Sequence, residues 1–198
     1  MEGDRKIWED FKCDADYALS DIYGKNIDFL FIYGKKFTKD ESLILDTIQD
    51  IFYDLIRNRN NLGSTDNIRL YLLKTFRRRI LRTFEKNRKL FWLEPTSLHA
   101  EPEITFSVEE KIIQDEESAQ RIRSLKQAMK TLNARQREVL YYKFTCGFDY
   151  DEICEIMSIS YDSARQLVSR SIKKLKQKLT PTSFIFLFVR LKEIDKGK

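Results

Sequence analysis

The chain has 198 residues, of which 42% are hydrophobic, so it can bury the core of one large domain or two small ones. Charged residues make up 34% and the net charge is +5, a balance that favours a polyanionic partner such as nucleic acid or a membrane surface. Three irregularly spaced cysteines and a single histidine argue against a disulfide framework, a zinc site and a histidine-based catalytic centre. With only six glycines and three prolines, β-hairpin signals are scarce, and the chain is predicted to be all-α, with two helical domains joined by a linker.

Residues 1–92 are predicted to form the first helical domain. Apolar residues recur at helical spacing between Leu19 and Tyr33, and again in the segment "DESLILDTIQDIFYDLIRN" at 40–58. One face of that segment is an apolar stripe, which suits burial in a core. The opposite face is polar and acidic and carries Asp46, Gln49, Asp50, Tyr53, Asp54 and Arg57.

A polar loop, "NRNNLGSTDN" at 58–67, separates this segment from a basic one, "LLKTFRRRILRTFEKNRK" at 72–89. The loop contains Asn60 and Asn61 and ends in two candidate helix N-caps, Asp66 and Asn67.

The basic segment is predicted to be an amphipathic helix. Its apolar side consists of Leu72, Leu73, Phe76, Ile80 and Phe84. Its other side carries Tyr71, Lys74, Arg78 and Arg82. Such a helix can lie on an anionic membrane or present its cations to nucleic acid. We favour nucleic acid, because the neighbouring apolar stripe needs a partner to bury it and because a surface tyrosine among cations suits stacking with single-stranded bases. A solvated charged face is the plain structural alternative.

Residues 93–117 contain two prolines and a run of acids, and they are predicted to be an interdomain linker. The second domain is expected over residues 118–180. In it, Asn133 and Gln136 fit the N-cap and N3 positions of a capping box, and Gly147 ends that helix. Residues 181–198 form an apolar and basic tail, interpreted as an added helical turn over the domain's own core, with docking on another protein as the alternative.

The end of the second domain has the pattern of a helix-turn-helix, which needs a short first helix, a tight turn and a second helix with one polar face. Ser158 to Ser160 make the turn, with Ser160 capping the second helix, whose buried side includes Ala164 and Leu167. Arginine and glutamine on the outward side suit base edges, and lysine suits phosphates. These outward positions are Tyr161, Asp162, Arg165, Gln166, Ser169, Arg170 and Lys173. The plain alternative is a helical hairpin with a solvated basic face.

Three stretches together resemble bacterial sigma factors of the extracytoplasmic-function (ECF) group. The segment "DTIQDIFYDLI" looks like a helix of the family's region 2, and "YLLKTFRRRILRTFEKNRK" looks like the promoter-melting helix that follows it. The segment from "LKQAMKTLNARQREVL" to "SRSIKKLKQKL" looks like region 4. The run "FRRRILR" is similar to that of ECF factors from Bacteroidetes, although members of the group often have Asn and Asp in place of Arg78 and Arg82.

The resemblance implies a subunit of RNA polymerase that recognises and opens promoters and starts transcription. The polar face of 40–58 would bind core polymerase, on its β′ subunit, through Asp46, Gln49, Asp50, Tyr53 and Asp54. The −10 element, opened with a base flipped out, would meet Asn60, Asn61, Tyr71, Lys74, Arg78 and Arg82. The duplex −35 element would meet the seven outward residues from Tyr161 to Lys173. The acidic linker would pass through a basic polymerase channel, the β subunit would complete the polymerase interface, and the family pattern includes an anti-sigma factor.

We therefore predict a cytoplasmic protein with no enzymatic activity, cofactor or metal and no membrane association. A stand-alone helix-turn-helix regulator that binds duplex DNA is the first alternative, and the acidic face of 40–58 argues against it. A peripheral membrane protein using the 72–89 helix is a more distant one. A redox pair of Cys146 and Cys154 is less favoured than two small buried hydrophobes.

Overall fold

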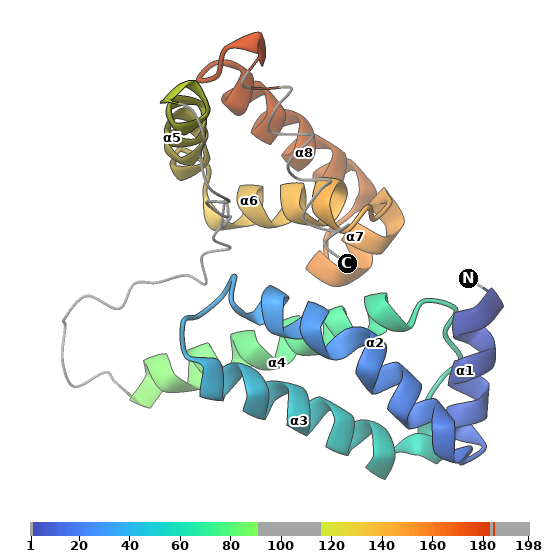
Figure 1. Ribbon diagram of the computed structural model, residues 1–198. Coiled ribbons are helices and arrows are strands. Elements are labelled where there is room, and N and C mark those ends of the chain that lie inside the picture. The colour runs from blue at the N-terminus through green and yellow to red at the C-terminus, as the bar shows by residue number, and fades with distance from the viewer. Residues whose placement is uncertain (1, 91–115, 183, 185–198) are drawn as a thin grey trace. The chain divides into compact units, whose positions relative to one another are not determined.

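The computed structural model of the chain describes residues 2–90, 116–182 and 184 (Figure 1). Within these residues the regular structure consists of eight α-helices, one 3-10 turn and one π-helical segment, with no strand, so the all-α prediction is confirmed. The chain divides into two compact units, Met1–Pro102 and Glu103–Lys198. No helix of the described residues is long and apolar enough to cross a membrane. Most of the predicted linker 93–117, including His99, and most of the tail 181–198 lie outside the described residues, whereas residues 116 and 117 belong to a helix.

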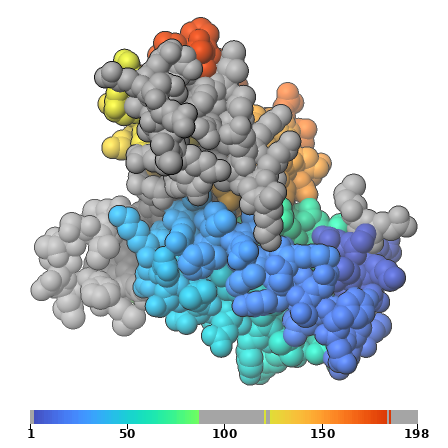
Figure 2. Space-filling view, viewed as in Figure 1, coloured from blue at the N-terminus to red at the C-terminus, as the bar shows by residue number. Residues whose placement is uncertain are grey.

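The first unit contains four α-helices and one short 3-10 turn. They are α1 (Glu2–Lys12), α2 (Asp16–Gly34), α3 (Glu41–Arg57), η1 (Arg59–Asn61) and α4 (Ile68–Leu90). Helices α3 and α4 run antiparallel and lie side by side, and α2 packs on both (Figure 1). α1 and α2 make up most of the face of this unit that Figure 2 presents.

The apolar stripes predicted for α3 and α4 form the core of this unit. The fully or almost fully buried side chains include Ile44, Ile48, Ile51, Leu55, Leu72, Leu73, Phe76 and Ile80. Gly34 allows α2 to pack closely on these side chains. A Cβ at Gly34 would lie 2.5 Å from a methyl group of Ile44 and 2.9 Å from the ring of Phe76. A larger residue there would force the packed core to shift.

The start of both long helices is fixed by side-chain caps. Asp40 accepts a hydrogen bond from the backbone N–H of Leu43 at 3.1 Å and so caps α3. Of the two candidates before α4, Asn67 is the cap, because its side chain accepts from the N–H of Leu70 at 2.9 Å. The backbone N–H of Ile68, the first residue of α4, donates a hydrogen bond to the carboxylate of Asp4 on α1, at 3.1 Å.

The second unit contains α5 (Glu116–Lys130), α6 (Ala134–Leu140), the π-helical segment η2 (Tyr141–Thr145), α7 (Tyr150–Met157) and α8 (Tyr161–Lys176). The predicted capping box of Asn133 and Gln136 is confirmed, with both reciprocal hydrogen bonds present. A second capping box, of Asp149 and Glu152, starts α7. α8 packs against α6 and α7, so its buried side is fixed by both.

The helix that begins at Ala134 does not run as a uniform α-helix to Gly147. It widens into η2, in which Tyr141 and Tyr142 are both buried. The hydroxyl of Tyr142 donates to the carboxylate of buried Glu138 at 2.9 Å. Gly147 then turns the chain with φ +72°, a conformation that favours glycine.

Candidate nucleic-acid and partner interfaces

Helix α8 presents a polar, basic face from a well-anchored frame. Its buried side consists of Ala164, Val168, Ser171 and Leu175, and Leu167, expected on that side, is half-buried. Ser160 caps the helix, since its hydroxyl accepts from the N–H of Ser163 at 3.3 Å. All seven residues predicted to face outward from Tyr161 to Lys173 are exposed. Helices α7 and α8 and their turn therefore have the geometry of a helix-turn-helix, and the outward face of α8 is exposed.

Two contacts organise the outward face of α8. The guanidinium of Arg170 donates to the side-chain oxygen of Gln166 at 3.1 Å, so these two residues orient each other. The ring of Tyr161 lies 5.5 Å from the ring of Tyr150 at the start of α7, and the ammonium of Lys143 lies 4.7 Å from the centre of the Tyr150 ring. The first turn of α8 is thus fixed by aromatic contacts in addition to its cap.

The turn before α8 contains a backbone conformation that is costly for its residue. Ser158 ends α7 in the left-handed region, with φ +52° and ψ +55°, where a Cβ is unfavourable.

We expect Ser158→Gly to stabilise the second unit by about 0.5–1 kcal/mol, because glycine adopts this conformation without the steric cost. Hydrogen exchange of the α8 amides would measure the change. Ser124→Gly is the matched control, because Ser124 is exposed inside α5, where glycine should lower stability by about 0.5–1 kcal/mol. Slower exchange in both variants, or in neither, would contradict the expectation.

Helix α4 exposes Lys74, Arg78 and Arg82, as predicted, and buries the side that carries Leu73 and Phe76. Because that apolar side is buried in the core of the unit, it is not available to a lipid surface. The prediction of a surface tyrosine is wrong at Tyr71. This residue is half-buried, and its ring lies 5.0 Å from the ring of Trp8 on α1, a helix that the periodicity analysis did not place.

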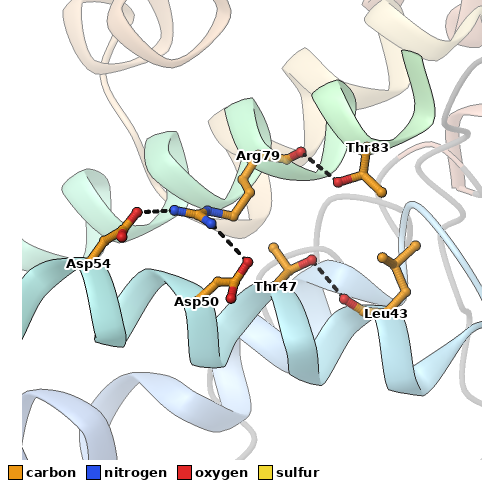
Figure 3. Close-up of polar contacts among 6 residues, drawn as sticks. All are labelled: Leu43, Thr47, Asp50, Asp54, Arg79 and Thr83. Atoms are coloured by element: carbon orange, nitrogen blue, oxygen red, sulfur yellow. Dashed lines mark hydrogen bonds and ion pairs between the residues drawn. The ribbon is translucent and has the colours of Figure 1, made fainter. Parts of the chain in front are cut away.

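The polar face predicted for α3 divides into two parts. Arg79 on α4 reaches across and forms ion pairs with Asp50, at 2.9 Å, and with Asp54 (Figure 3). Asp46, Gln49 and Tyr53 are exposed beyond this cluster. Two of the three acids are therefore partly neutralised within the chain. Arg79 lies in the middle of the basic segment, on neither of the two faces selected from sequence, and nothing within that segment pairs it with acids on another helix.

The exposed face of α3 also carries apolar side chains, and two of them, Leu45 and Ile56, were not predicted from sequence to be part of it. Leu45 is 50% exposed, Tyr53 61% and Ile56 43%. With Gln49 they recur at intervals of three and four residues and so form one stripe. An exposed apolar stripe beside acids is typical of a surface that binds another protein.

Cys154, in the second unit, does not have the character of a reactive thiol. Burial raises the pKa of the Cys154 thiol, and the nearby carboxylates of Asp151 and Asp149 raise it further. The thiol is therefore protonated at neutral pH and a poor nucleophile. Cys146 is half-buried.

The part of the chain from α5 to α8 corresponds to a known domain. Residues 122–175 match the family model described as sigma-70, region 4. The match spans 54 of the 198 residues and contains α7, the turn and α8 as far as Leu175, with all seven residues of α8 that were predicted to face outward. No curated protein and no solved structure matches the chain.

The region 4 match confirms that part of the resemblance found in the sequence. Region 4 belongs to a family of DNA-binding transcription factors, so the match supports a sigma factor or a related DNA-binding role. It agrees with the exposed cations and the anchored second helix of this unit.

Proposed function

We propose that the protein is a sigma factor of the ECF group, which binds core RNA polymerase and directs it to promoters. The observation that carries the proposal is the region 4 match in a chain whose other unit pairs a basic helix with an acidic and apolar one. A protein that only binds DNA does not need an exposed acidic and apolar helix such as α3. The membership of the ECF group and the resemblance to factors from Bacteroidetes stay predictions.

In this proposal the exposed face of α3 binds the polymerase. Its acids and its apolar stripe are adjacent on one helix, which suits a partner helix pair that carries both arginines and apolar side chains. The resemblance assigns this role to a coiled coil of the β′ subunit. Since Asp50 and Asp54 already bind Arg79, the residues most available to a partner are Asp46, Gln49 and Tyr53.

The −10 element would meet α4 and the loop before it. Lys74, Arg78 and Arg82 are exposed and suit phosphates, and Asn60 and Asn61 expose amides that can pair with a base edge. Flipping a base out of the duplex costs about a few kcal/mol, so such a pocket must offset that cost. Tyr71 is a poorer candidate for stacking than it was from sequence, because its ring contacts Trp8.

The −35 element would meet α8 in the major groove. Arg165 and Gln166 are exposed and of the types that suit base edges, and Arg170 and Lys173 are exposed and suit phosphates. The passage of the linker through a polymerase channel and an anti-sigma factor as a further partner also belong to the proposal, and both rest on the resemblance alone.

The second candidate function is a stand-alone regulator that binds duplex DNA through the helix-turn-helix. The region 4 match is equally compatible with it. It leaves the exposed stripe of Leu45, Tyr53 and Ile56 without a role.

Transcription in vitro tests the proposal. Bacterial core polymerase lacking other sigma factors would be mixed with the protein and fragmented genomic DNA, and transcript 5′ ends would be mapped. Discrete start sites that require the protein are expected, with a shared upstream motif. A folded sample that binds duplex DNA, gives no protein-dependent starts and does not co-elute with polymerase would favour the stand-alone regulator.

A further inference from the structure

Helix α1 holds the loop between α3 and α4 at three separate points. The indole N–H of Trp8 donates to the carbonyl of Gly63 in the middle of the loop, at 2.8 Å. At its start, Arg59 forms an ion pair with Asp14, just after α1, and lies 5.4 Å from the centre of the Phe11 ring. At its end, the Asp4 carboxylate accepts from the N–H of Ile68, at 3.1 Å, where α4 begins.

The Trp8 contact is rigid because the indole is completely buried. Its ring lies 5.9 Å from Phe11 and 5.0 Å from Tyr71, so the core of the unit fixes its orientation. Burying an N–H group without an acceptor costs free energy, so the hydrogen bond fixes the Gly63 carbonyl beside the indole.

The Arg59 contact is internal to the unit. Its side chain is only 19% exposed and contacts the Asp14 carboxylate and the Phe11 ring, although the neighbouring Asn60 is exposed. Asp14 is 79% exposed and has φ +65°, a left-handed conformation that aspartate tolerates better than most residues. The arginine thus fastens the loop and does not present its charge to a ligand.

Between these three points the loop turns its polar groups outward. Asn60, Asn61, Ser64 and Asp66 are exposed. Ordering a free loop costs backbone entropy at every residue, and a loop held in place before binding avoids much of that cost.

We propose that α1 is a clamp that preorganises this loop to receive an unstacked base of the opened promoter strand. Trp8 and Arg59 with Asp14 are positioning residues, which act through the loop and do not touch the DNA. The inference rests on the proposed function, in which the loop meets the −10 element.

The test uses the full-length protein and two variants. Trp8→Phe keeps a ring in the core and removes the hydrogen bond to Gly63, and Asp14→Asn removes the carboxylate that binds Arg59 while keeping a residue that tolerates positive φ. The probe is a labelled single strand covering the −10 element of a promoter mapped in the transcription assay. The same promoter's −35 duplex serves as the second probe.

We expect each variant to bind the single strand about 3- to 10-fold more weakly, the effect of losing one hydrogen bond or partly buried ion pair. Binding to the −35 duplex should stay within about 2-fold. The dependence of affinity on salt should keep its slope, because no phosphate contact is lost. Tyr17→Phe is the matched control, since it removes a hydrogen bond to Asp10 on α1 without touching the loop, and it should bind like the unaltered protein.

Two results would overturn the clamp. The first is unchanged single-strand binding by both variants. The second is tighter binding by Asp14→Asn with a steeper salt slope, which would mean that the freed Arg59 binds phosphate directly. Hydrogen exchange of loop residues 60–66 separates this inference from the proposed function. If the unaltered protein does not bind the single strand, the proposed −10 role fails, whatever the exchange shows. Faster exchange confined to the loop in Trp8→Phe then still supports α1 as a clamp on the loop. Unchanged exchange in Trp8→Phe overturns the clamp as well.

Discussion

The double substitution Asp46→Lys and Tyr53→Ala should abolish stable binding to core polymerase, with a Kd at least about 100-fold weaker, or about 2.8 kcal/mol. Both side chains are exposed on α3, so the fold should survive their loss. Removing a large exposed ring from the centre of an interface and reversing a neighbouring charge attack both the apolar and the electrostatic part of the contact. Co-elution with polymerase and a titration by fluorescence anisotropy would measure the effect.

The choice of residues depends on Arg79. Reversing Asp50 or Asp54 would place a lysine against this arginine, so weaker polymerase binding could come from a disturbed α3–α4 pair. Asp46 and Tyr53 avoid that ambiguity. The matched control is Asp28→Lys with Tyr17→Ala, which makes the same changes on exposed positions of α2. Polymerase binding that is equal for the test variant and the unaltered protein would contradict α3 as the docking face.

Arg165→Ala should weaken binding to the −35 duplex by about 1–3 kcal/mol if its guanidinium pairs with a guanine edge. It should also relax the sequence preference at one base pair. The side chain is exposed, so thermal unfolding should change little. A competition assay with duplexes that differ at single positions would show both the loss and its position.

Two controls give this result its meaning. Lys173→Ala should weaken binding to all sequences alike and lower the slope of the salt dependence by about 1, because it removes a phosphate contact. Arg123→Ala removes an exposed arginine from another helix, α5, and should leave DNA binding unchanged. If Arg165→Ala behaves like Arg123→Ala, Arg165 faces solvent in the complex.

The helical architecture could be predicted from sequence because its signals are local. The stripe from Ile44 to Leu55 and the side of α4 around Phe76 repeat at the helical period, and each side is buried as that period requires. The capping box at Asn133 is likewise a relation between residues three apart. The same reasoning selected the exposed face of α8, because the turn and its cap fix which side of that helix is buried.

The features that sequence reasoning missed are contacts between distant segments. Arg79 meets Asp50 and Asp54 across two helices, and Trp8 meets Gly63 and Tyr71 from the other end of the unit. No periodicity in one segment reports such pairs. The π-helical segment from Tyr141 to Thr145 was missed as well, and no pattern in the sequence marks it.

Because Arg79 forms ion pairs with α3, the positive charge that α4 presents to a ligand depends on what binds α3. A partner that brings its own cations to Asp50 and Asp54 must share these carboxylates with Arg79 or displace it. A displaced Arg79 would join Lys74, Arg78 and Arg82, and α4 would become more positive. By thermodynamic reciprocity, a polyanion that draws Arg79 away from α3 must then favour the partner by the same free energy. The unit thereby links the occupancy of two neighbouring helices through a single side chain.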